Sequence, residues 1–332
     1  MKKIINKPEQ VVLEMCQGMV KAYPDKLALD PKYRFITRKD PNPRKVSLVS
    51  GGGSGHEPAH AGYVGTGMLD AAVCGDVFAS PSSTQVYKAI LATRSEKGTL
   101  LIVKNYTGDC MNFDGAAEMA REDDDVDVES VYVNDDVAVK DSLYTAGRRG
   151  VAGTVFVHKI AGAAAELGWD LPAVKAVAEK AVSRVRSIGF ALTSCTVPAR
   201  GVPTFDIGEG DMEYGVGIHG EPGISREALA PADELASRAV AALLADLPFR
   251  KGDEVAVLVN GLGGTPLQEL FILNNKASDL LAEAGIGIHK TFVGNHMTSL
   301  DMAGASITLL QLDGELKGLL DAPADTTAFR QA

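Results

Sequence analysis

The fold of this chain is decided by the stretch Val46-Ser47-Leu48-Val49-Ser50, which runs directly into Gly51-Gly52-Gly53-Ser54-Gly55-His56-Glu57-Pro58-Ala59-His60. A short apolar run with β-branched residues, followed by glycines, is typical of a buried strand that ends in a loop. Glycine backbone can approach a ligand closely because it carries no side chain. In open α/β sheets, ligands bind beyond the carboxyl ends of the strands. The stretch therefore predicts a small-molecule site in which His56 does acid or base work.

Two other interpretations of the same stretch fail. His56-Glu57-Pro58-Ala59-His60 matches the letters H-E-x-x-H of zinc proteases, which need both histidines on one face of a helix. Pro58 argues against that helix, because proline is tolerated only in a helix's first turn. We therefore expect no metal site here. No Lys-Ser or Lys-Thr pair follows the glycines, so a Walker A phosphate loop is also excluded.

A second polar segment follows the clearest buried strand, Leu100-Leu101-Ile102-Val103. It reads Lys104-Asn105-Tyr106-Thr107-Gly108-Asp109. Because it lies at the carboxyl end of a strand, Asp109 is a second candidate for the site. The alternative is that Asp109 caps a turn or a helix and that Lys104 is a solvated residue at the strand end.

A third segment carries a histidine among glycines, Tyr214-Gly215-Val216-Gly217-Ile218-His219-Gly220-Glu221-Pro222-Gly223. Its letters imitate the dinucleotide pattern G-x-G-x-x-G, but that pattern must open a helix, which Pro222-Gly223 prevents. What remains is a tight loop that aims His219 outward. His60 is either a support for its own loop or part of the substrate's surroundings. The other histidines are expected to be structural or exposed: His158, His289 and His296.

The totals limit the class of protein. With 332 residues and 45% hydrophobic content, the chain is long enough for two domains with their own cores. Its net charge of -10 argues against nucleic acid or an anionic membrane as the main partner. No apolar run is long enough to span a bilayer. No signal peptide is expected at the start, and four widely spaced cysteines form no C-x-x-C pair, so we expect a cytoplasmic protein with reduced thiols.

The order of expected elements indicates an α/β fold with two domains, residues 1–187 and 188–332. Each should contain a mostly parallel or mixed sheet flanked by helices. Residues 134–150 form a polar segment too long for a simple connection, which is typical of a site or an interface. The apolar spacing predicts helices at 8–22, 83–95, 111–121, 171–187, 231–247 and 265–284. Strands are expected at 71–78, 126–133, 190–197, 255–259, 286–292 and 307–310.

Together, these segments resemble the dihydroxyacetone kinase family. The resemblance rests on Ser50 to Pro58, Lys104 to Asp109, Asp135 to Gly150 and Gly215 to Gly223, and it continues through Asn260-Gly261-Leu262-Gly263-Gly264-Thr265-Pro266 and Ser299-Leu300-Asp301-Met302. It covers essentially the whole chain. More narrowly, the chain resembles the substrate-binding K subunit of the bacterial multi-subunit enzyme.

The resemblance implies roles for the candidate residues. His219 would attack the ketone carbon of dihydroxyacetone through a ring nitrogen and hold the substrate as a covalent hemiaminal. Asp109 and His56 would bind and deprotonate the terminal hydroxyl that accepts phosphate. Lys104 and the backbone around Gly53, Ser54 and Gly55 would hold the substrate. The site would lie between the two domains.

The resemblance also implies partners. Single-chain members carry ATP and metal on a second region that we do not find here, so this chain should bind no cofactor itself. Nucleotide and Mg would arrive on an L subunit, recharged by ATP exchange or by a phosphocarrier M subunit of the phosphotransferase system. The acidic surface and residues 134–150 are candidate docking regions, and a homodimer is implied. The alternative is a relative that binds dihydroxyacetone without phosphorylating it and activates a transcription regulator.

Overall fold

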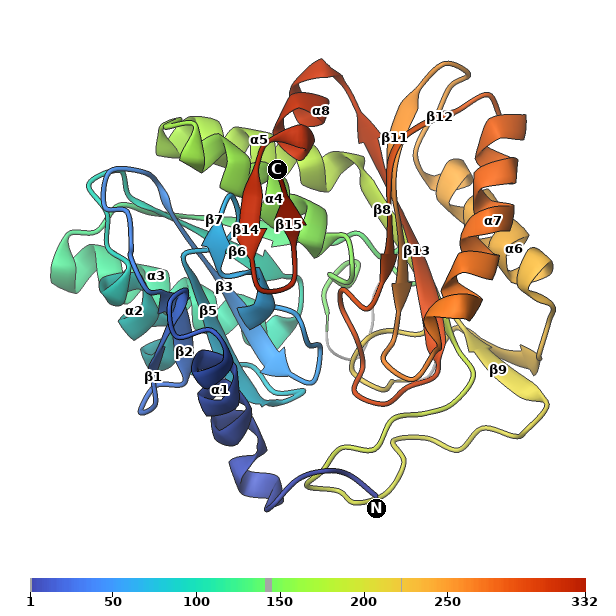
Figure 1. Cartoon of the computed structure of the whole chain (residues 1–332), viewed down its shortest axis with the longest axis horizontal. Helices are drawn as coiled ribbons and strands as arrows, with labels where there is room; N and C mark the ends of the chain where they lie inside the picture. The colour runs from blue at the N-terminus through green and yellow to red at the C-terminus, as the bar shows by residue number, and fades with distance from the viewer. Residues whose placement is uncertain (1, 141–144, 222) are drawn as a thin grey trace.

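The computed structural model describes residues 2–140, 145–221 and 223–332 as two six-stranded sheets flanked by helices (Figure 1). Both sheets are mixed, because each combines parallel and antiparallel pairs. This confirms the α/β class expected from the sequence. No helix in the described ranges is long and apolar enough to cross a membrane.

The first sheet has the strand order β1-β2-β5-β3-β6-β7, and the four strands from β5 to β7 run parallel. Its strands are β1 (Leu27–Asp30), β2 (Phe35–Arg38), β3 (Ser47–Ser54), β5 (Ala71–Val77), β6 (Thr99–Lys104) and β7 (Val128–Val133). Alternate residues of β6 face opposite sides, as the period of a strand requires. Leu101 and Val103 pack with helices α2 (Ser83–Ala92) and α3 (Thr107–Asp124). Leu100 and Ile102 face the opposite side of the sheet and belong to a second apolar core, which is described below.

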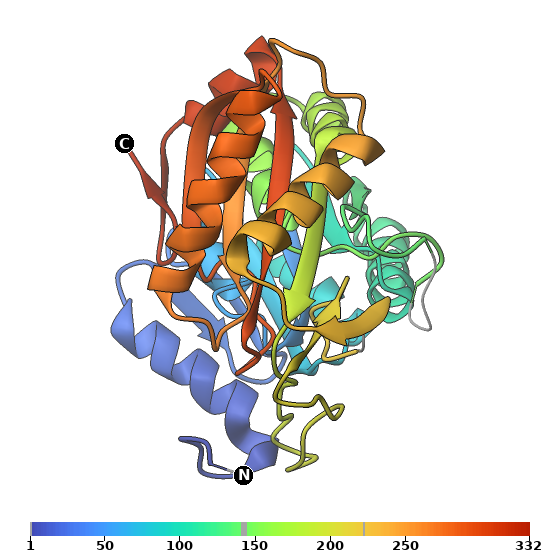
Figure 2. The same cartoon turned by 90° about the vertical axis from the view of Figure 1, so that its right-hand side faces the viewer.

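The second sheet has the order β10-β9-β8-β13-β11-β12. Its strands are β8 (Val185–Ala191), β9 (Asp211–Tyr214), β10 (Ser225–Ala228), β11 (Glu254–Gly261), β12 (Gly287–Gly294) and β13 (Gly304–Leu312). Helices α6 (Ala232–Asp246) and α7 (Leu267–Glu283) cover its outer face, which Figure 2 shows from the front. A separate apolar core lies between these helices and the sheet.

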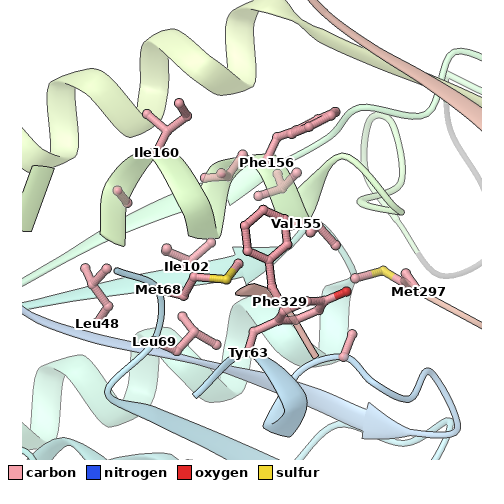
Figure 3. Close-up of a cluster of buried hydrophobic side chains, with 14 of the residues drawn as sticks. Leu48, Tyr63, Met68, Leu69, Ile102, Val155, Phe156, Ile160, Met297 and Phe329 are labelled. Atoms are coloured by element: carbon pink, nitrogen blue, oxygen red, sulfur yellow. The ribbon is translucent and has the colours of Figure 1, made fainter. Parts of the chain in front are cut away.

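The largest core lies where the two halves meet. Helices α4 (Thr154–Glu166) and α5 (Leu171–Arg184) pack among side chains of both sheets, together with α1 (Val11–Ala22) and α8 (Gly314–Asp321). In Figure 3, Leu48 and Ile102 of the first sheet lie below α4, which contributes Phe156 and Ile160 to the same cluster, and Phe329 reaches this cluster from the end of the chain.

The end of the chain returns to the first half. Strands β14 (Ala324–Thr326) and β15 (Arg330–Gln331) form a small sheet with β4 (Gly65–Thr66), in which Thr326 pairs with Gly65. A short 3₁₀ turn, η2 (Ala61–Tyr63), precedes β4, and another, η1 (Pro8–Gln10), precedes α1. We propose that the two sheets mark the domains expected at 1–187 and 188–332, with this tail reaching back across the division.

Two expectations for the segments that carry candidate site residues differ from the structure. The glycine run was expected to be a loop, yet β3 continues through Gly51 to Ser54. Gly51 pairs with Val73 of β5, and a Cβ atom at Gly51 would lie 2.4 Å from the Val73 carbonyl oxygen, so glycine is needed for this pairing. Asp109 was expected in a polar loop and instead lies in the first turn of α3.

The region around the domain boundary was also predicted incompletely. The helix expected at 171–187 ends at Arg184, and the strand expected at 190–197 occupies Val185–Ala191. Val185 fits both the helical and the strand periodicity. It belongs to the strand because it pairs with Leu310 of β13. Helix α4 was not predicted at all. Its residues from 154 to 165 are all buried, so it has no polar face and no helical periodicity to read.

Candidate active site

The three segments singled out in the sequence meet between the two sheets. His56 follows the end of β3, and His219 lies in the loop after β9. Their Nε2 atoms are 3.1 Å apart. A segment of the second half holds the first loop by its backbone, since the amide groups of Thr298 and Leu300 donate to the carbonyl oxygens of His56 and Gly55. The second half thus supplies both His219 and part of the frame around His56.

Hydrogen bonding defines how the two imidazole rings share their protons. Nδ1 of His56 lies 2.9 Å from the carbonyl oxygen of Thr298, which can only accept. Nδ1 of neutral His56 therefore carries the proton, and its Nε2 has the lone pair. The contact between the two Nε2 atoms then requires that His219 donates from Nε2. His56 is consequently placed to take the proton from the His219 nitrogen that faces it.

Both rings are held in the neutral state. Burial, assisted by the positive charge of Lys104, lowers the pKa of His56 to about 3. Burial also lowers the pKa of His219 well below its usual value, and His56, Lys104 and Arg149 act in the same direction. An imidazole that stays neutral keeps a lone pair free for use as a nucleophile or a base.

Lys104 and Asp109 form a buried ion pair beside the glycine run. Lys104 is the last residue of β6, and its Nζ lies 3.5 Å from Oδ2 of Asp109. Both side chains are buried. A Cβ atom at Gly52 would lie 2.5 Å from this Nζ, so the glycine allows the ammonium group to approach the strand backbone. The N-terminus of α3 favours the negative charge of Asp109, which lies in its first turn.

Aromatic rings surround His219. The Tyr106 ring meets it edge-on with a centroid distance of 4.3 Å, and the Phe78 ring does so at 5.5 Å. Phe78 also stacks on His56. We gave neither aromatic residue a role from the sequence. Tyr106 lies inside the motif that ends in Asp109, so its position in the sequence could have identified it as a site residue. Phe78 has no such motif, because its contact with His219 depends on how the two halves pack.

Several buried polar atoms around His219 have no hydrogen-bond partner among the described residues. They are Lys104 Nζ, Tyr106 Oη, His219 Nδ1 and Glu221 Oε2. Buried polar groups in native proteins nearly always have a partner, and each one without a partner calls for an explanation. A small ligand rich in hydroxyl and carbonyl oxygens would supply these partners.

The remaining sequence candidates lie around this centre. Gly53 packs against the backbone at Ala79. The Ser54 hydroxyl donates to the carbonyl oxygen of Gly75, and the Gly55 amide donates to the Glu57 carboxylate, so both groups already have partners. His60 pairs with His158 instead of His219, with 3.0 Å between Nδ1 and Nε2. This contact supports the first of the two alternatives left open above, in which His60 stabilises its own loop.

Comparison with known proteins identifies the family. The Dak1 domain model matches residues 17–328. The chain is 52% identical over 330 residues to the PTS-dependent dihydroxyacetone kinase 1, dihydroxyacetone-binding subunit DhaK, of Listeria innocua, covering 99% of this chain and 100% of that protein. It is 45% identical to the PEP-dependent counterpart of Escherichia coli over 355 residues, covering 99% of each chain.

Solved structures agree with this assignment. The Dihydroxyacetone kinase operon co-activator DhaQ matches with a TM-score of 0.91 and 36% identity, over 96% of this chain and 98% of that one. The dihydroxyacetone kinase of C. freundii, in complex with AMP-PNP and Mg²⁺, matches with a TM-score of 0.91 and 40% identity, over 99% of this chain and 61% of that one. As the sequence motifs predicted, the chain belongs to the Dak1 domain family, the family of the dihydroxyacetone kinases and their DhaK subunits.

Proposed function

We propose that this chain is the dihydroxyacetone-binding subunit of a multi-subunit dihydroxyacetone kinase and that His219 holds the ketone as a covalent hemiaminal. The observation that carries the proposal is the neutral, buried His219, whose Nε2 faces the Nε2 of His56 at 3.1 Å. The buried polar atoms without partners around it provide the support. Relatives that are 52% and 51% identical are named dihydroxyacetone-binding subunits of PTS-dependent enzymes.

The covalent step uses atoms that lie in contact. The proton on Nε2 of His219 leaves, and the electron pair of that N–H bond forms the bond to the carbonyl carbon while the carbonyl π bond breaks. The proton that leaves Nε2 passes to Nε2 of His56 and then to the former carbonyl oxygen, which becomes the hydroxyl of the hemiaminal. Glycerol has the same terminal hydroxyls but no electrophilic carbon, so it forms no adduct. Selectivity therefore comes from a bond and not from pocket size.

The second step is transfer of a phosphoryl group to a terminal hydroxyl. Asp109 would accept the proton of that hydroxyl, and Lys104 would neutralise the negative charge that develops. The donor would come from a partner L subunit that carries nucleotide and Mg, recharged through an M subunit. The names of the PTS-dependent relatives support the phosphotransferase route. A homodimer and docking through residues 134–150 remain part of this proposal.

Mass measurement of the intact protein tests the covalent step. Incubation with dihydroxyacetone should add the mass of one ligand to the wild-type chain in native mass spectrometry. H219A should show no adduct, whereas H289A, at a histidine whose ring pairs with Asp321, should form it fully. An adduct of unchanged yield in H219A would show that another group binds the ketone.

A sensor is the second candidate. It is favoured by the likeness to the co-activator DhaQ, which shares this fold at a TM-score of 0.91. A kinase assay separates the two functions. The wild-type chain, mixed with an L subunit and a phosphoryl donor from the same organism, should phosphorylate dihydroxyacetone. Adduct formation without turnover would favour the sensor.

A further inference from the structure

We propose that Arg149 is a positioning residue that fixes the His219 loop so that Nε2 is aimed at the ketone carbon. The proposal rests on the proposed role of His219. It uses the polar segment 134–150, whose purpose the sequence left open.

The guanidinium group of Arg149 bridges both ends of the loop that carries His219. Its Nη2 donates to the carbonyl oxygen of Gly215 at 2.8 Å, and its Nη1 donates to Oε1 of Glu221 at 3.2 Å. The side chain is only 2% exposed. His219 thus lies between Gly215 and Glu221, and the rigid, planar guanidinium group of Arg149 binds both of these residues.

Arg149 is itself held by a rigid frame. Its Nε donates to Oδ2 of Asp136 at 2.7 Å, and that carboxylate also accepts from the amide of Ala138. The preceding residue, Asp135, accepts from the amides of Val151 and Gly153 at the start of α4, and its carbonyl oxygen accepts from the Ser187 amide in β8. The guanidinium group is therefore tied to a helix and to a central strand of the second sheet.

Glu221 connects the guanidinium group to the histidine. The backbone amide of His219 interacts with the Glu221 carboxylate and favours the charged form, which opposes the rise that burial causes in the pKa of Glu221. The fit is close at the middle of the loop, where a Cβ atom at Gly217 would lie 2.7 Å from Nη1 of Arg149 and 2.3 Å from Oε1 of Glu221. Burial raises the pKa of Glu221, and the charge of Arg149 opposes that shift. Loss of Arg149 would favour a protonated Glu221, a weaker acceptor for the His219 amide.

Two conservative variants test the proposal. R149K keeps the positive charge but cannot hold three separate acceptors in one plane. E221Q keeps the size of the side chain and removes the ion pair. Native mass spectrometry measures the adduct at a fixed dihydroxyacetone concentration, below the melting temperature of each variant. We expect the equilibrium constant for the adduct to fall at least about tenfold in R149K, and to fall less in E221Q, whose amide oxygen can still accept.

The matched control is R148K. Arg148 is the adjacent residue and bonds Asp246 at 2.7 Å through Nη1, away from the His219 loop. It should form the adduct as wild type does, even where its melting temperature falls. The proposal is overturned if folded R149K and E221Q both form the adduct at wild-type yield, or if R148K loses it equally. If R149K does not fold, the adduct yield of E221Q alone tests the proposal, and a wild-type yield in E221Q overturns it. A wild-type chain that forms no adduct would instead refute the proposed function.

Discussion

Nε2 of His56 lies 3.1 Å from Nε2 of His219, although 163 positions separate the two residues in the sequence. One ring is anchored on the first sheet and the other on a loop of the second. The contact exists only when both halves are folded and packed together. Any reaction that needs both histidines therefore requires that the two halves of the chain are folded and packed against each other.

The pH dependence of adduct formation follows from the lowered pKa of His219. In the proposed reaction the neutral ring is the nucleophile, and a base with a lowered pKa stays neutral until the pH falls well below the usual value of about 6.5. Adduct yield should therefore stay level from about pH 8 down to about pH 5.5. Native mass spectrometry over this range checks the expectation. A yield that halves near pH 6.5 would mean that the ring titrates as an ordinary exposed histidine.

Replacing Asp109 should separate the two chemical steps. D109N keeps the shape of the side chain but removes the proposed base, so adduct formation should remain while phosphoryl transfer falls by about 10²- to 10⁴-fold. The measurement is turnover with the partner subunit, with adduct mass in parallel. D114N is the matched control, because Asp114 is an exposed residue of the same helix and bonds only Tyr132 among the described side chains. Full turnover in D109N would assign the base to another group.

Gly52 tests the need for close backbone approach. A Cβ atom there would lie 2.5 Å from Lys104 Nζ, and the φ angle of +151° is unfavourable for alanine. G52A should displace the ammonium group, lower turnover and cost about 1–3 kcal/mol of stability. G18A is the control, since Gly18 lies within α1 and a Cβ atom added there would meet no other atom within 4 Å, and it should stabilise by about 0.5–1 kcal/mol. Chemical denaturation and a kinase assay measure both effects.

Stability should fall in acid because of the buried histidine pair. Burial and the charge of Lys104 lower the pKa of His158 to about 3 and that of His60 well below its usual value. Between about pH 6.5 and the folded-state pKa, the unfolded chain binds protons that the native chain does not. Each such histidine then removes about 1.4 kcal/mol of stability per pH unit as the pH falls. H158N should make the plot of unfolding free energy against pH less steep, and an identical slope would contradict this account.

The sequence predicted those parts of the candidate site that carry a local signature. Gly-rich stretches marked His56 and His219, and a strand end marked Lys104 and Asp109. It did not predict Phe78, or the bridging contacts of Arg149, because these contacts are made by packing between distant segments and leave no pattern in the neighbouring residues.

The same distinction holds for the fold. Helices α6 and α7 have one apolar face, and their periodicity predicted them within a few residues. Helix α4 is buried on every side, so its sequence shows no alternation of polar and apolar residues. The extension of β3 through the glycines follows from pairing with β5, a tertiary contact that overrides the low strand propensity of glycine.

The pairing of β14 with β4 makes the first half of the fold depend on residues near position 326. Thr326 pairs with Gly65, and the amide of Ala328 donates to the carbonyl oxygen of Gly62, only a few positions after His60. A nascent chain on the ribosome contains both histidines long before residues 324–331 emerge from the exit tunnel. The contacts of the loop that follows His56 therefore cannot be complete before residues 324–328 are available. A chain that stops before residue 324 would carry every proposed catalytic group and still lack the strands that close the frame around them.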